Sequence, residues 1–204
     1  MKEAAFEITQ LISNYGNMVY LLIFLTIACE TGLIFAAFLP GDSLVFASGA
    51  LAASGVLDIW ILYLVVSIAS IVGNCLSYLI GVLVGEKLII KCHGKLLNKE
   101  NVEKTHLFFQ KYGALALPLS RFMPIVRSLA PFMAGVGEMS FFKFLIFNSI
   151  GSVIWGSFFL TAGYFAGNIK LLQNNFWIMT LVSLLIPFVS VAVFFVVKKF
   201  RGGK

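Results

Sequence analysis

The sequence predicts an all-α polytopic membrane protein, formed by one membrane domain over residues 1–204. The chain is 60% hydrophobic and only 12% charged, and its mean hydropathy is +0.97. A soluble domain is nearer to about half apolar and about a quarter charged. The apolar runs are long and do not alternate with polar residues as the strands of a membrane barrel do. We therefore expect helices that cross or enter the bilayer.

Charge and cysteine content exclude several classes of function. The net charge of +6 does not indicate binding to nucleic acid, because the basic residues gather in one loop and in the C-terminal tail. That pattern is typical of cytoplasmic anchoring beside anionic lipid head groups. Cys29, Cys75 and Cys92 are widely separated and give neither a disulfide framework nor a metal site. We expect no metal and no cofactor.

The first elements are an interfacial helix and a broken hairpin. Residues 1–17 are weakly amphipathic and too polar to span, so we expect them at the membrane surface. Residues 18–38 are long enough to cross but contain Glu30. Pro40 and Gly41 then form a turn signal.

A second short helix is predicted after this turn. Asp42 is suited to cap a helix that begins near Leu44. The apolar run from there to Gly55 is too short to span a bilayer unaided. Residues 18–55 are therefore predicted to form a re-entrant hairpin, broken at Pro40 and Gly41.

A spanning helix and a basic loop follow the hairpin. Residues 59–85 form an apolar run with the length of a plain transmembrane helix. In residues 86–112 six lysines outnumber three glutamates, so the positive-inside rule predicts a cytoplasmic loop that contains an interfacial helix.

Residues 113–137 combine fixed positive charge with helix breakers. Arg121 and Arg127 lie in apolar sequence, with Pro124 and Pro131 beside them. A guanidinium cannot escape burial by losing its proton, and prolines prevent one continuous spanning helix here. A broken helix that carries charge at membrane depth belongs in a protein-lined or watery cavity. This stretch therefore predicts a second re-entrant hairpin and an anion site.

Two further spanning helices complete the predicted topology. Residues 141–167 and 175–197 are apolar and long enough to cross. The basic tail after residue 197 predicts a cytoplasmic C-terminus, consistent with two crossings after the lysine loop.

A repeat underlies this order of elements. A spacing of 82 residues relates three pairs of glycines: Gly55 and Gly137, Gly81 and Gly163, and Gly85 and Gly167. Residues 1–85 and 113–167 each have a broken hairpin followed by a spanning helix. We interpret them as two copies in opposite orientation, an arrangement typical of transporters with a site near the membrane midplane.

Four charged residues lie well inside the predicted hairpins. Glu30 and Asp42 belong to the first copy, and Arg121 and Arg127 to the second. An ion inside the membrane costs several kcal/mol, so four of them suggest function. The arginines suit a phosphate, and helix ends beside Asp42 and Arg121 offer further N–H donors. A carboxylate held away from water keeps a proton more readily, which allows coupling to protons.

Simpler interpretations of the polar residues stay open. Glu30 and Asp42 can be structural partners of the arginines and nothing more, and Asp42 can be mainly a helix cap. The intramembrane amides and hydroxyls are expected to form hydrogen bonds between helices rather than to bind a ligand. This set comprises Asn74, Ser77, Asn148, Ser149 and Ser152. The tryptophans, Trp155 among them, are expected to be core or interface anchors.

Several of these residues also resemble the DedA membrane proteins, which contain the SNARE-associated or VTT domain. The first half resembles the family in Glu30-Thr31-Gly32 and Leu39-Pro40-Gly41-Asp42-Ser43. The second half resembles it in Arg121-Phe122-Met123-Pro124-Ile125-Val126-Arg127 and in Asn148, Gly151 and Trp155. Asn74 stands where the family often has Asp. The similarity covers about residues 15–170.

The resemblance implies facing re-entrant hairpins and movement of lipids across a bacterial cytoplasmic (inner) membrane. It places Glu30 and Asp42 as proton-coupling residues or charge partners, and Arg121 and Arg127 as substrate-binding residues. Undecaprenyl phosphate is the first candidate substrate, and a phospholipid flippase or scramblase is the alternative. Membrane lipids, protons and a second copy of the chain are the expected partners. An intramembrane lipid phosphatase is less favoured, because no His or Cys lies near the arginines in the sequence. A passive assembly protein is a third reading.

Overall fold

The computed structural model describes residues 17–33, 41–91 and 99–169, and every regular element in these ranges is a helix. The elements in chain order are α2 (Asn17–Gly32), α3 (Gly41–Ala53), α4 (Ile59–Lys91), α5 (Lys99–Tyr112), the 3₁₀ turn η2 (Gly113–Leu115), α6 (Ala116–Ser120), α7 (Pro124–Val136) and α8 (Phe141–Gly167). The predicted all-helical class is confirmed for these residues. The predicted interfacial helix at residues 1–17, the turn residue Pro40 and the predicted last helix at 175–197 lie outside them, save for Asn17.

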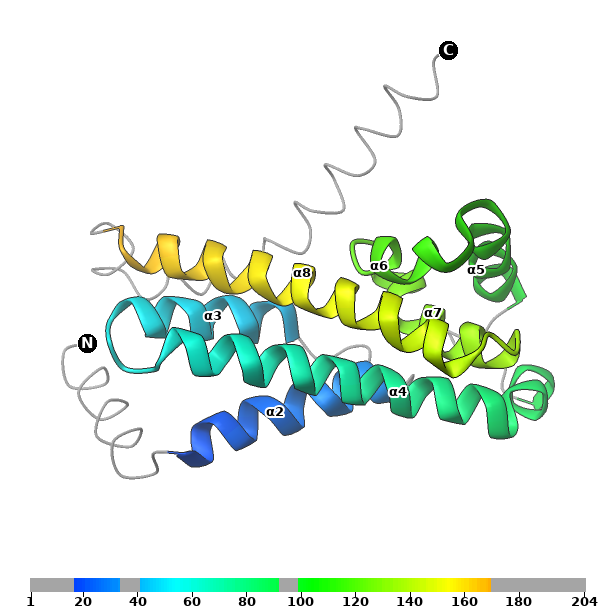
Figure 1. Cartoon of the computed structure of the whole chain (residues 1–204), viewed down its shortest axis with the longest axis horizontal. Helices are drawn as coiled ribbons and strands as arrows, with labels where there is room; N and C mark the ends of the chain where they lie inside the picture. Colours follow the sequence, from blue (N-terminus) through cyan, green and yellow to red (C-terminus); the bar gives the residue numbers. More distant parts are fainter. Residues whose placement is uncertain (1–16, 34–40, 92–98, 170–204) are drawn as a thin grey trace, which may run out of the picture.

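Two long helices form the frame of the molecule (Figure 1). The apolar parts of α4 and α8, Ile59–Leu83 and Phe141–Gly167, contain 25 and 27 residues. At about 1.5 Å of rise per residue, each is long enough to cross a bilayer. The outer face of α4 carries exposed large apolar side chains four residues apart, at Leu64, Ile68, Val72 and Leu76. Such a face suits contact with lipid tails.

Each long helix packs against a short helix from the other half of the chain. Helix α3 packs along α8, and α7 packs along α4. At the first crossing, a Cβ on Gly163 would collide with the backbone carbonyl of Phe46. At the second crossing, a Cβ on Gly81 would collide in the same way with the carbonyl of Phe132. Glycine at both crossings therefore lets the paired backbones approach closely.

Two predicted boundaries need correction. Helix α4 continues to Lys91 rather than ending at Gly85, because nothing between these residues breaks a helix. Helix α3 begins at Gly41 rather than near Leu44. Asp42 therefore lies in its first turn, where a carboxylate interacts favourably with the helix dipole.

The prediction that Pro131 breaks the hairpin is wrong, because Pro131 lies inside α7. A proline removes one backbone hydrogen bond from a helix, here the bond to the carbonyl of Arg127. The neighbouring residues Ala130 and Phe132 are completely buried. Packing of this turn in the core therefore keeps the helix continuous through the proline.

Candidate functional site

A short break between α6 and α7 positions the two arginines. Helix α6 ends at Ser120, and Arg121 follows as its C-cap residue. Met123 is extended, with φ −120° and ψ 107°, as expected for a residue before proline. Pro124 then occupies the first turn of α7, where its missing N–H costs nothing. Arg127 follows one turn later, so the break directs the two side chains to different neighbours.

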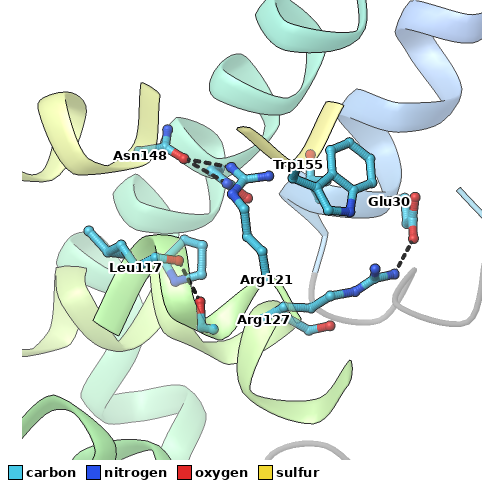
Figure 2. Close-up of a pocket in the computed structure, with 11 residues that line it drawn as sticks. Glu30, Leu117, Arg121, Arg127, Asn148 and Trp155 are labelled. Atoms are coloured by element: carbon cyan, nitrogen blue, oxygen red, sulfur yellow. Dashed lines mark hydrogen bonds and ion pairs between the residues drawn. The ribbon is translucent and has the colours of Figure 1, made fainter. Parts of the chain in front are cut away.

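Arg127 is bound to two carboxylates from the first half of the chain. Its Nη1 lies 2.6 Å from both Asp42 Oδ1 and Asp42 Oδ2. Its Nη2 lies 2.8 Å from Glu30 Oε1, an ion pair drawn in Figure 2. The Glu30 and Asp42 side chains are only 3% and 11% exposed. Helices α2, α3 and α7 therefore meet at a buried ion-pair cluster, whose charged hydrogen bonds offset the cost of burying the ions.

Gly41 makes room for one of these carboxylates. A Cβ on Gly41 would overlap the carboxyl group of Glu30. Glu30 therefore lies directly against the first residue of α3, a helix of 13 residues. The amino-terminal end of a helix carries partial positive charge, which stabilises a carboxylate there. A larger side chain at position 41 would therefore displace the Glu30 carboxyl group.

Arg121 is surrounded by neutral partners. Its Nη1 donates to Ser70 Oγ at 2.8 Å, and its Nη2 donates to Asn148 Oδ1 at 3.0 Å and to Ser152 Oγ. The guanidinium carbon lies 5.8 Å from the ring centroid of Trp155, a cation–π contact. Within residues 17–33, 41–91 and 99–169, no carboxylate forms an ion pair with Arg121. Figure 2 shows its side chain pointing to Asn148 and away from the Glu30–Arg127 pair.

Asn74 and Asn148 join the two long helices, as predicted. Asn74 Nδ2 donates to Asn148 Oδ1 at 2.7 Å, and Asn148 Nδ2 donates to the Ile71 carbonyl at 3.3 Å. Asn148 Oδ1 thus accepts from Asn74 and from Arg121 together. The prediction of interhelical hydrogen bonds is confirmed for this pair. The structure adds that Asn148 and Ser152 also hold an arginine.

Trp155 is the site residue that sequence reasoning assigned to packing alone. Its Nε1 donates to Asp42 Oδ1 at 3.2 Å, and its ring contacts Arg121. Trp155 therefore touches a member of each arginine's group. The helical spacing of Asn148, Ser152 and Trp155 places all three on one face of α8, and this spacing is the signal that would have found it.

A small cavity lies between these groups (Figure 2). Its walls include both arginines, Glu30, Asn74, Asn148 and Trp155. The volume open to the centres of water-sized molecules is about 30 Å³, which suffices for about two or three waters.

The side chains at this site suit charge pairing and could exchange a proton. Among the described residues, no group of three His, Cys, Asp or Glu side chains is placed to hold a metal ion. The two carboxylates and two guanidiniums are the only charged side chains in the cluster, within the described ranges. Guanidiniums suit binding of an oxyanion, and buried carboxylates suit uptake and release of a proton.

The chain is similar to known membrane proteins over most of its length. The VTT domain family model matches residues 39–165. Protein DedA of Escherichia coli K12 is 43% identical over 171 residues, which cover 83% of this chain and 78% of that relative. An uncharacterized membrane protein of Mycobacterium leprae is 38% identical over 72% of this chain and 65% of its own. Inner membrane protein YghB of Escherichia coli K12 is 33% identical over 78% and 73%. No solved structure matches the chain.

Proposed function

This chain is a membrane protein of the DedA family and contains its VTT domain, and from that premise we propose that it is a lipid translocase. It moves a phosphate-headed lipid, undecaprenyl phosphate first and a phospholipid second, across a bacterial cytoplasmic membrane. The proposal rests on one observation: four charged side chains, from both halves of the chain, line or border one small cavity.

The carboxylates would control how strongly the site attracts an anion. Arg127 already binds Asp42 and Glu30. When a carboxylate takes up a proton, its attraction for Arg127 weakens and the cluster gains net positive charge, which favours entry of an anionic head group. Release of the proton on the other side would restore the ion pairs and expel the head group. This cycle explains why acids and arginines occur together at the cavity.

Inverted repeats would supply the alternating access that such a cycle needs. The α3–α8 and α7–α4 crossings use glycines at matching positions, Gly163 and Gly81, which are 82 residues apart. These contacts support two copies of opposite orientation, residues 1–85 and 113–167, each with a re-entrant hairpin. In this topology the loop at 86–112 and the C-terminus are cytoplasmic, and the chain crosses the membrane several times.

Reconstitution in liposomes tests the proposal. Transbilayer movement of fluorescent undecaprenyl phosphate and of a fluorescent phospholipid would be followed with and without a pH gradient. We expect gradient-sensitive movement of undecaprenyl phosphate, abolished in Glu30→Gln and in Arg127→Ala. Lys143→Ala, an exposed charge at the start of α8, is the matched control and should be active.

The alternatives give different results in the same vesicles. Movement of several lipids without dependence on the gradient would make the protein a scramblase. Release of inorganic phosphate from the lipid would instead indicate an intramembrane phosphatase. If no lipid moves in folded protein, the translocase proposal is wrong, and the four charges have a structural role.

A further inference from the structure

We propose that the two arginines have different functions: Arg121 binds the oxyanion of the ligand, whereas Arg127 is the internal partner that the carboxylates hold and release. The inference rests on the proposed function and assigns the anion site within it. The site consists of the Arg121 guanidinium with Ser70, Asn148 and Ser152 around it, and the Trp155 ring beside it.

The charge balance of the cluster carries this assignment. Both carboxylates in the cluster contact Arg127, at 2.6 Å and 2.8 Å. Within the part of the chain that the structure describes, Arg121 donates only to neutral acceptors. An ion in a water-poor interior needs a counter-charge, because desolvation costs several kcal/mol that neutral partners offset only in part. Arg121 is therefore the cation that an external anion would stabilise most.

The Arg121 guanidinium also has N–H donors that the described residues do not use. An arginine offers five N–H groups, and three hydrogen bonds from Arg121 to side chains of the described residues are present. Two N–H groups therefore have no partner among these residues. The residue lines the cavity. These are the Nε–H and one N–H of Nη1, because Nη2 already makes two hydrogen bonds, so each can donate one hydrogen bond to an anion oxygen.

The surrounding side chains suit a small tetrahedral oxyanion. Ser70, Asn148 and Ser152 are buried. The Ser70 hydroxyl can donate to an anion while it accepts from Arg121, whereas the Ser152 hydroxyl already donates to the Asn148 carbonyl. Trp155 lies against the guanidinium and donates to Asp42. A ligand bound at Arg121 would therefore be sensed by the acid cluster through Trp155. The shared ligand chemistry is a phosphate, whether carried by a lipid head group or free in water.

The isosteric substitution Asn148→Asp would place a negative counter-charge beside Arg121 within the protein. In Asn148→Asp the oxygen that accepts from Arg121 at 3.0 Å is kept and becomes part of a carboxylate. The internal ion pair should offset the lost hydrogen bond to the Ile71 carbonyl and displace an external anion. Asn168→Asp is the control for added charge, because Asn168 is the exposed C-cap residue of α8 and its substitution likewise removes one donor to a carbonyl, that of Tyr164.

The experiment measures equilibrium binding of fluorescent farnesyl phosphate to the purified full chain in detergent. Farnesol and inorganic phosphate are the competitors, which separate the lipid source of the phosphate from the free one. We expect Asn148→Asp to lose at least tenfold in affinity without a fall in Tm, while Asn168→Asp binds as the unmodified chain does. Arg121→Gln, which keeps a hydrogen-bonding amide, should lose binding to the same extent. In Arg127→Met/Glu30→Gln/Asp42→Asn, where Arg121 is the one charge left of the four, binding should persist although transport is lost.

Opposite results would overturn the assignment. Binding that is unchanged in both Asn148→Asp and Arg121→Gln would exclude Arg121 as the anion site, and so would the absence of binding in the unmodified chain. If lipid transport in liposomes persists under these outcomes, only this inference fails. If Arg121-dependent binding is found but no lipid moves, the translocase proposal fails and the anion site stands.

Discussion

Arg121 and Arg127 are six residues apart, on either side of Pro124, yet their surroundings are opposite. Arg127 lies between two carboxylates, and Arg121 lies among hydroxyls, an amide and an indole ring. The break at residues 121–123 produces this difference, because Arg121 lies in it, at the C-cap of α6, whereas Arg127 lies in α7. Two identical side chains in one cavity wall therefore have different electrostatic roles.

We expect stability and function to be separable at this site. Removing one member of a buried ion-pair cluster leaves an uncompensated charge, at a cost of about 3–5 kcal/mol. Removing a guanidinium that has only neutral partners leaves unsatisfied hydroxyl and amide groups, at about 1–3 kcal/mol each at most. The Arg127 cluster should therefore dominate folding, and the Arg121 group should dominate ligand binding.

The largest expected effect follows loss of the Arg127 charge. Arg127→Met should lower the free energy of unfolding by about 3–5 kcal/mol, because Glu30 and Asp42 are left buried without a cation. The combined variant with Glu30→Gln and Asp42→Asn should recover much of this loss. Thermal unfolding in detergent measures both. Equal Tm values for Arg127→Met and the unmodified chain would refute the buried-cluster interpretation.

A smaller loss is expected when Glu30 is displaced. Gly41→Ala places a methyl group where the Glu30 carboxyl lies, so the variant should lose about 1–3 kcal/mol through overpacking. Transport should fall with it, because Glu30 leaves Arg127. The control is Ala47→Gly, at an exposed position in the same helix, α3. Gly55→Ala would not serve, because Gly55 has φ +77° and a side chain there would be strained. Transport at the unmodified rate in Gly41→Ala would show that the position of Glu30 is unimportant.

Trp155→Phe tests the contact between the two arginine groups. It removes the donor to Asp42 Oδ1 and keeps an aromatic ring beside Arg121. The expected loss of stability is about 1 kcal/mol, since Arg127 still satisfies Asp42. Farnesyl phosphate should still bind, but its affinity should no longer change with the Glu30→Gln substitution. A persistent effect of Glu30→Gln in the Trp155→Phe background would exclude Trp155 as the link.

The smallest effect is expected at Glu138, which belongs to neither arginine's group of contacts. Glu138, in the turn between α7 and α8, is the one non-glycine residue with positive φ in the described ranges, at 50°. Glu138→Gly should raise the free energy of unfolding by up to about 1 kcal/mol, because glycine adopts this conformation without strain. A rise in Tm with unchanged transport would confirm that only local backbone strain was relieved. A fall in transport would instead indicate a role for the Glu138 carboxylate.

Composition and local pattern were enough to predict much of the molecule. Long apolar runs predicted the helices, because hydrophobic length is a local property. Pro124 and the paired arginines predicted a broken element, and the break is found at residues 121–123. The four charged residues stood out in the sequence because a charge in apolar sequence is costly wherever it lies. Membrane location agrees with the names of the relatives.

The sequence by itself thus determined the helical class, the position of the break and the identity of the four charged residues. Only the tertiary structure decided which arginine meets the carboxylates, since these contacts join residues 85 and 97 positions apart. Only the tertiary structure shows that Trp155 belongs to the site, that α7 continues through Pro131, and that Gly41 leaves space for the Glu30 carboxyl group. Helix formation and the cost of a charge in apolar sequence depend on residues close together in the chain. Which charged side chains form ion pairs depends instead on how α2, α3, α7 and α8 pack.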